Sequence, residues 1–168
     1  MIPEEMSAQL AEVAGKPCWH VGAGGRVGSS FSLALGGKVE RDRPLRHAPE
    51  TDEAKRYQGE FRFLVWCSWR LGNSGAAIAS SDQEPDNIAA ALEVLRGNVL
   101  VEAVAQPPAW DLCLRFRDGC LLSVFCDHLR GDASIEQNWE LWHGSRALLV
   151  GPGYEWRLHD ESPNGSRR

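Results

Sequence analysis

The chain has 168 residues, of which 43% are hydrophobic and 24% are charged, as in an ordinary globular protein. Its net charge of −5 at pH 7 is unlike the basic surface of most nucleic-acid-binding proteins, so we expect no nucleic-acid partner. No apolar stretch approaches the roughly 20 residues of a membrane-spanning helix, and the acidic N-terminus is unlike a signal peptide. We therefore expect a cytoplasmic protein without membrane contact, whose five cysteines remain reduced.

The first predicted element is a helix over residues 4–14, which has a counterpart 82 positions later over residues 86–96. The apolar residues of both helices share the i, i+4, i+7 spacing of one helix face: Met6, Leu10 and Val13 in the first, and Ile88, Leu92 and Leu95 in the second. Gly15 and Gly97 follow these helices, and we expect both to end them in the left-handed conformation.

The remainder of each half is predicted to form strands. In residues 60–71 every second residue is apolar, and these residues share one face: Phe61, Phe63, Val65, Cys67, Trp69 and Leu71. The turn sequence Asp118-Gly119 predicts a tight hairpin between two further strands. The predicted strands besides 60–71 cover residues 31–35, 76–80, 110–116, 120–126 and 147–150.

Short motifs repeat in the same order in the two halves. Val65-Trp66-Cys67 corresponds to Val124-Phe125-Cys126, and Trp69-Arg70-Leu71 corresponds to Trp139-Glu140-Leu141. We therefore predict an α+β fold built from a duplicated module of one helix and four strands, forming antiparallel sheet or sheets with two helices. The two repeats would cover residues 3–80 and 85–151 of a single pseudo-symmetric domain (1–159), followed by a flexible tail (160–168).

The two halves differ by insertions. Residues 38–59 are a mixed-charge excess of the first half, and residues 127–138 are an excess of the second half. Few apolar residues occur in 38–59, so we expect this segment to be the most mobile part of the interior of the chain. Inserted surface segments are either solvated loops without a role or sites of function.

Two Cys-X-His pairs, Cys18 with His20 and Cys126 with His128, have the spacing of zinc ligands on one side of a strand. Nothing in the spacing brings the two pairs together, and buried cysteines are common core residues, so we predict no metal. Residues 22–28 form a glycine-rich loop, but a predicted strand follows it instead of the helix that a phosphate-binding loop needs. We predict no catalytic residue and no cofactor.

Three motifs of the second half carry a family resemblance: WDLCLRFRDG at residues 110–119, LSVFCD at 122–127 and WEL at 139–141. They resemble a loose group of small uncharacterised bacterial proteins, some of which are similar to the immunity partners of polymorphic toxins. The motifs are structural. The resemblance implies a two-copy, strand-rich fold and no known activity.

Two hypotheses for function follow. The first is a non-enzymatic protein-binding module, such as an immunity-type inhibitor, that uses an acidic, tryptophan-rich surface to bind a basic partner. The residues expected on this surface are Trp110, Trp142, Trp156, Arg43, Glu50 and Asp52. The alternative is a small-molecule-binding protein or a minor enzyme with a pocket between the two repeats.

Overall fold

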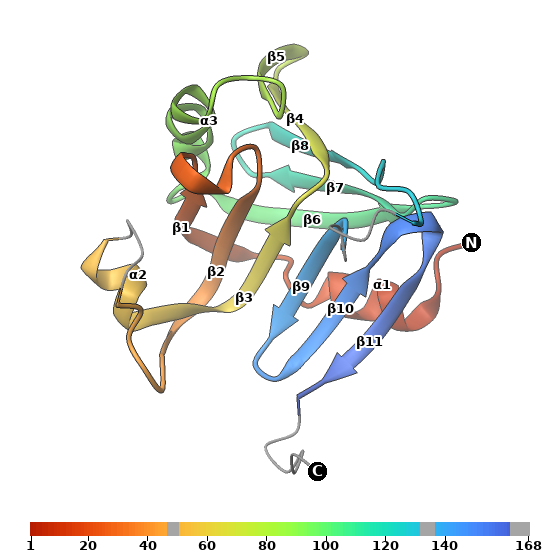
Figure 1. Ribbon diagram of the computed structural model, residues 1–168, viewed down its shortest axis with the longest axis horizontal. Coiled ribbons are helices and arrows are strands. Elements are labelled where there is room, and N and C mark those ends of the chain that lie inside the picture. Colours follow the sequence, from red (N-terminus) through yellow and green to blue (C-terminus); the bar gives the residue numbers. More distant parts are fainter. Residues whose placement is uncertain (47–50, 132–136, 162–168) are drawn as a thin grey trace.

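An antiparallel sheet dominates the fold (Figure 1). The computed structural model describes residues 1–46, 51–131 and 137–161, and within them 11 strands pair in the order β11-β10-β9-β3-β2-β1-β6-β7-β8-β4-β5. Helices are few in these ranges, so the predicted α+β class is confirmed. No helix of the described residues is both long and apolar enough to cross a membrane.

The elements divide into two runs along the chain. The first run comprises α1 (Glu4–Ala11), β1 (Lys16–Ala23), the 3-10 helix η1 (Gly25–Val27), β2 (Phe31–Glu40), α2 (Asp52–Arg56), β3 (Tyr57–Val65), β4 (Ser68–Asn73) and β5 (Ala76–Ser80). The second run comprises α3 (Pro85–Leu92), η2 (Glu93–Leu95), β6 (Val99–Gln106), β7 (Asp111–Phe116), β8 (Cys120–Phe125), β9 (Trp139–His143), β10 (Arg146–Val150), η3 (Pro152–Tyr154) and β11 (Trp156–Asp160).

The two predicted helices form where their apolar spacing places them. All six residues of the predicted faces are buried: Met6, Leu10, Val13, Ile88, Leu92 and Leu95. Gly15 and Gly97 have φ angles of +82° and +80°, so both adopt the expected left-handed conformation. Their amides also make matching contacts across the molecule, because Gly15 N donates to Leu100 O (2.7 Å) and Gly97 N donates to Cys18 O (2.6 Å).

One hairpin of each run pairs with a strand of the other run. The strands β1, β2 and β3 pair in sequence, but the next hairpin, β4–β5, pairs with β8 of the second run. In the same way β6, β7 and β8 pair in sequence, while the hairpin β9–β10 pairs with β3 of the first run. The strand order is therefore the same when read outward from β1 and from β6, with β11 as an additional edge strand.

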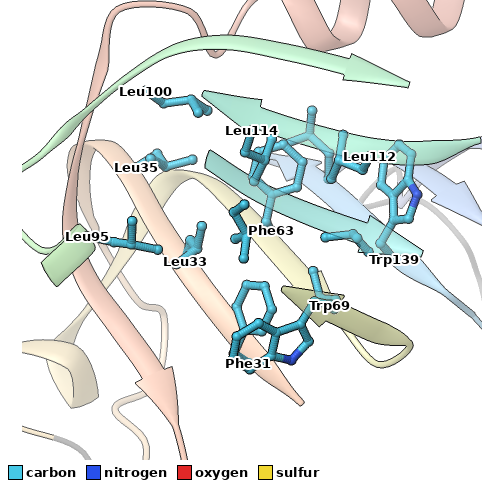
Figure 2. Packing of buried hydrophobic residues seen from close by; sticks show 14 of the residues in the cluster. Phe31, Leu33, Leu35, Phe63, Trp69, Leu95, Leu100, Leu112, Leu114 and Trp139 are labelled. Atoms are coloured by element: carbon cyan, nitrogen blue, oxygen red, sulfur yellow. The ribbon is translucent and has the colours of Figure 1, made fainter. Parts of the chain in front are cut away.

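One hydrophobic core joins the inner faces of the whole sheet (Figure 2). Side chains from β2 and β3, such as Leu33 and Phe63, share it with Leu112 of β7, Trp69 of β4 and Trp139 of β9. The six residues predicted to share one face of 60–71 are all buried. That segment nevertheless forms two strands, β3 and β4, because the chain passes from one half of the sheet to the other between them.

Several elements differ from the sequence-based expectation. The strands β1, β6, β9 and β11 and the helix α2 were not among the predicted elements. Each run contains more than four strands, and the helices number three among the described residues. A register shift between Cys18 and His20 interrupts β1, and another between Leu100 and Glu102 interrupts β6, which removes the regular alternation. Asp160, the first residue of the predicted tail, is the last residue of β11, and residues 162–168 lie outside the described ranges.

Candidate functional site

The described residues of the insertion at 38–59 extend the sheet and pack against it. The strands β2 and β3 continue into the insertion as a paired hairpin, with Lys38 opposite Gly59. The helix α2 begins where Thr51 Oγ1 accepts a hydrogen bond from Ala54 N (3.2 Å), and the side chain of Ala54 is buried. The insertion therefore provides a wall above the outer face of the first strands.

A cavity of about 230 Å³ lies between this wall and the outer face of β1, β2 and β3. We name it the insertion pocket. Its described lining includes aromatic, guanidinium and leucine side chains, among them Trp19, Tyr57, Arg41, Arg62, Leu45 and Leu64. Apolar walls with a small number of charged groups are typical of a binding site.

A second cavity of about 470 Å³, named here the seam pocket, adjoins the first and shares His20, Ser32 and Leu64 with it. Half of its described lining comes from β1, β2 and β3, and the other half includes Glu93 and Arg96, which follow α3. The seam pocket therefore lies where the two runs of the chain meet.

Arginines give the described lining of the insertion pocket a positive character. Arg41 and Arg62 line the insertion pocket, and Arg96 lines the seam pocket, where its Nε lies 2.9 Å from Glu93 Oε2. Arg41 Nε donates to Ala54 O (3.2 Å). Burial lowers the pKa of the Arg62 guanidinium, and the nearby charge of Arg41 lowers this pKa further.

Trp142 is the residue of the predicted binding surface that lies beside these pockets. It stands directly opposite Arg62 in the pairing of β9 with β3, and the Arg62 guanidinium carbon lies 5.7 Å from the centre of its ring. The ring is half-buried, and its Nε1 donates to Glu140 Oε2 (2.5 Å).

The remaining predicted residues lie elsewhere. Trp110 and Trp156 are half-buried at the edge of the core, and Trp110 Nε1 donates to Tyr154 O (2.9 Å). Arg43 and Asp52 are exposed on the insertion. The sixth predicted residue, Glu50, lies outside the described residues. The structure therefore does not gather the predicted residues into one surface.

The two Cys-X-His pairs serve separate local contacts. Cys18 Sγ donates to His20 O (3.5 Å), whereas Cys126 Sγ donates to Trp110 O (3.4 Å). In the described part of the chain, no three His, Cys, Asp or Glu side chains come together as metal ligands.

Buried thiols should react slowly in the folded protein. Burial raises the pKa of Cys18 to about 12, and a hydrogen bond with Cys126 together with burial raises the pKa of Cys67. A raised pKa keeps a thiol protonated and therefore weakly nucleophilic at neutral pH. We expect Ellman's reagent to leave Cys18, Cys67 and the buried Cys120 unmodified in the native protein and to count five thiols after unfolding. Rapid native modification of Cys18 would contradict this.

Sequence reasoning did not single out Trp19, Leu64 or Arg62, although all three line the insertion pocket. The available signal was an arginine between the buried residues Phe61 and Phe63, which places its charge on the outer face of β3. Its surroundings depend on β9, a strand that is distant in the sequence.

Comparison of the chain with models of protein families, with curated proteins and with solved structures gives no match.

Proposed function

We propose that this protein is a non-enzymatic binding protein, of the kind represented by immunity-type inhibitors, that holds a segment of a partner protein in the insertion pocket and the seam pocket. The observation that carries this proposal is the insertion itself. It occurs in the first run of the chain and not in the second, and it builds a pocket wall with Arg41, Leu45 and Tyr57.

The proposal depends on a duplicated scaffold, which we also infer. Two buried tryptophans support the duplication, because Trp69 Nε1 donates to Ser29 O (2.7 Å) and Trp139 Nε1 donates to Trp110 O (3.0 Å). The two acceptors occupy corresponding positions. Ser29 stands two residues before Phe31 of β2, and Trp110 stands two residues before Leu112 of β7, each of which is the first buried residue of the second strand of its run. The reciprocal contacts of the two cap glycines and the matching strand orders agree with this relation.

Departures from the shared scaffold indicate where function was added. In the second run, β7 and β8 are joined by the short turn at Arg117, Asp118 and Gly119, so no helix comparable with α2 lies between them. A scaffold that folds with a short turn in one half does not need 38–59 in the other half for its folding. Inserted segments held on a rigid sheet are common sites of recognition.

The pocket lining indicates what kind of segment fits. Aromatic rings and arginines are the residue types that contribute most to protein interfaces. Among the described residues, the charged groups that line the pockets are mainly cationic, and the carboxylate of Glu93 pairs with Arg96. We therefore propose an acidic segment of the partner for these pockets, which differs from the basic partner expected from net charge alone.

Substitution of Leu64 by Arg is the test, because Leu64 lines both pockets. Its matched control is Ser123→Arg. Ser123 is an outward-facing residue of β8 that lies opposite Cys113, just as Leu64 is an outward-facing residue of β3 that lies opposite Ser32. Tagged wild-type protein should retain a partner from cells of the source organism, Leu64→Arg should lose it, and Ser123→Arg should keep it. Retention by Leu64→Arg, or equal loss from both variants, would refute the proposal.

The seam pocket supports a second candidate, the binding of a small molecule. Its lining comes from both runs of the chain, which is the position expected for a ligand site between duplicated halves. Recovery of a metabolite without any protein partner from the same experiment would favour this candidate.

A further inference from the structure

Arg62 has an unusual environment for an arginine on the outer face of a sheet. Its neighbours across the strands are Ala34 of β2 and Trp142 of β9, so neither adjacent strand places an acid directly opposite it. The side chain is half-buried and lies over the ring of Trp142. Among the described residues, none forms a hydrogen bond or an ion pair with its guanidinium.

The contrast with Arg115 makes the difference clear. Arg115 lies on the outer face of β7 in the other half of the sheet, is exposed, and has its Nε 3.1 Å from Glu102 Oε2. Arg62 is more buried, and the like charge of Arg41 lowers its pKa by more than either Glu140 or Glu161 alone raises it. A buried cation normally has a partner of opposite charge, because desolvation without one is costly.

A second donor of the same pocket is also unsatisfied. Trp19 lines the insertion pocket, and its Nε1 is buried without an acceptor among the described residues. Buried indole N–H groups usually have a hydrogen-bond partner. The described lining of the pocket therefore includes two residues, Arg62 and Trp19, whose donors have no acceptor among the described residues.

The size and walls of the pocket restrict the group that could satisfy them. Its volume of about 230 Å³ is below the ~300 Å³ at which pockets for drug-sized ligands begin. The space suits one short side chain or one small organic anion. Leu45, Tyr57 and Leu64 provide apolar contacts around the charged group, which favours a carboxylate on an apolar body over a strongly hydrated phosphate.

We propose that the insertion pocket is a carboxylate-binding site in which the guanidinium of Arg62 binds both carboxylate oxygens and the rings of Trp19 and Tyr57 flank the attached apolar group. The planar fork of an arginine matches the two oxygens of a carboxylate. This site rests on the proposed function, because it names the chemical group of the partner segment that the same pocket takes.

Titration with sodium benzoate, followed by nitrogen-15 NMR of the indole and guanidinium N–H groups, tests the site at constant ionic strength. Benzoate should shift the signals of Trp19, Trp142 and Arg62 in a saturable manner, and inorganic phosphate should shift them much less. Arg62→Gln should weaken benzoate binding by roughly 10- to 100-fold, since it removes charge-assisted hydrogen bonds. Arg115→Gln should leave the affinity unchanged.

Arg62→Met keeps the experiment informative if Arg62→Gln is poorly folded. Removal of a charge that has no ion-pair partner among the described residues should raise the melting temperature without benzoate by roughly 2–4 °C. It should also abolish the stabilisation that benzoate gives the wild type. A lower melting temperature of Arg62→Met, unchanged benzoate affinity in Arg62→Gln, or stronger binding of phosphate would overturn the carboxylate site.

The two proposals can fail separately. If benzoate does not bind but Leu64→Arg still loses the protein partner, the carboxylate site is refuted and partner binding stands. If benzoate binds through Arg62 but Leu64→Arg retains the partner, the carboxylate site stands and the proposed location of the partner is refuted.

Discussion

Trp139→Ala should lower the free energy of unfolding by about 4 kcal/mol, which is a large part of the stability of an ordinary domain. Trp139 is completely buried, packs near Phe63 with ring centres 6.5 Å apart, and donates its Nε1 to Trp110 O. Alanine leaves a cavity where β9 joins β3 and removes that hydrogen bond. Urea unfolding followed by far-ultraviolet circular dichroism measures the loss without depending on tryptophan fluorescence.

Two further variants serve as comparisons for Trp139→Ala. Trp69 is the corresponding residue of the other run, is 1% exposed, and makes an edge-on contact with Phe31, so Trp69→Ala should be similarly destabilising. Trp66 is 38% exposed, and Trp66→Ala should cost less than about 1 kcal/mol. A loss below about 1 kcal/mol for Trp139→Ala would show that the core collapses around the deleted ring.

Gly59→Ala should destabilise the fold by about 3 kcal/mol, because the added Cβ would overlap main-chain atoms that cannot rotate away. It would lie 2.5 Å from Phe61 O, 2.8 Å from Leu35 N and 2.9 Å from Ala34 Cα. These atoms belong to the paired strands β2 and β3, so relief requires a shift of the sheet beneath the insertion pocket. Chemical denaturation and the benzoate titration should both detect the change.

Gly37→Ala is the matched control for this backbone clash. Gly37 lies on β2 near Gly59, but the Cβ of an alanine there would approach only Glu60 Oε2, at 3.7 Å. That distance is an ordinary contact, so Gly37→Ala should change the stability by no more than about 0.5 kcal/mol. Equal stability of the two alanine variants would disprove the steric explanation.

The predictable part of the fold is the part that a local pattern specifies. Two-residue alternation identified the buried face from Phe61 to Leu71, and helical spacing identified the buried faces of α1 and α3. Local patterns fail where a strand is irregular or exposed. β1 contains Pro17 and a register shift, and β11 is an edge strand whose last four residues are exposed, so neither has a regular alternation.

The candidate site was less predictable because it depends on contacts between distant segments. Pairing of Arg62 with Trp142 requires β9 to lie beside β3, and no local sequence pattern encodes that neighbour. The six predicted residues were chosen for their type, and tryptophan is common both in cores and at interfaces. Only the position of each tryptophan in the fold distinguishes a core residue from a surface one: Trp142 lies beside Arg62, whereas Trp110 lies at the edge of the core.

The exchanged hairpins bear on how the protein folds and unfolds. Since β4–β5 completes one half of the sheet and β9–β10 completes the other, neither run of the chain contains all of its own sheet partners. Loss of either hairpin exposes core surface in both halves at once, which makes them a single cooperative unit. Pairs such as Phe61 with His143 join residues separated by about half of the chain, and such a high contact order slows folding. The same arrangement links any strain at the insertion pocket on β3 to the packing of β9 and β10.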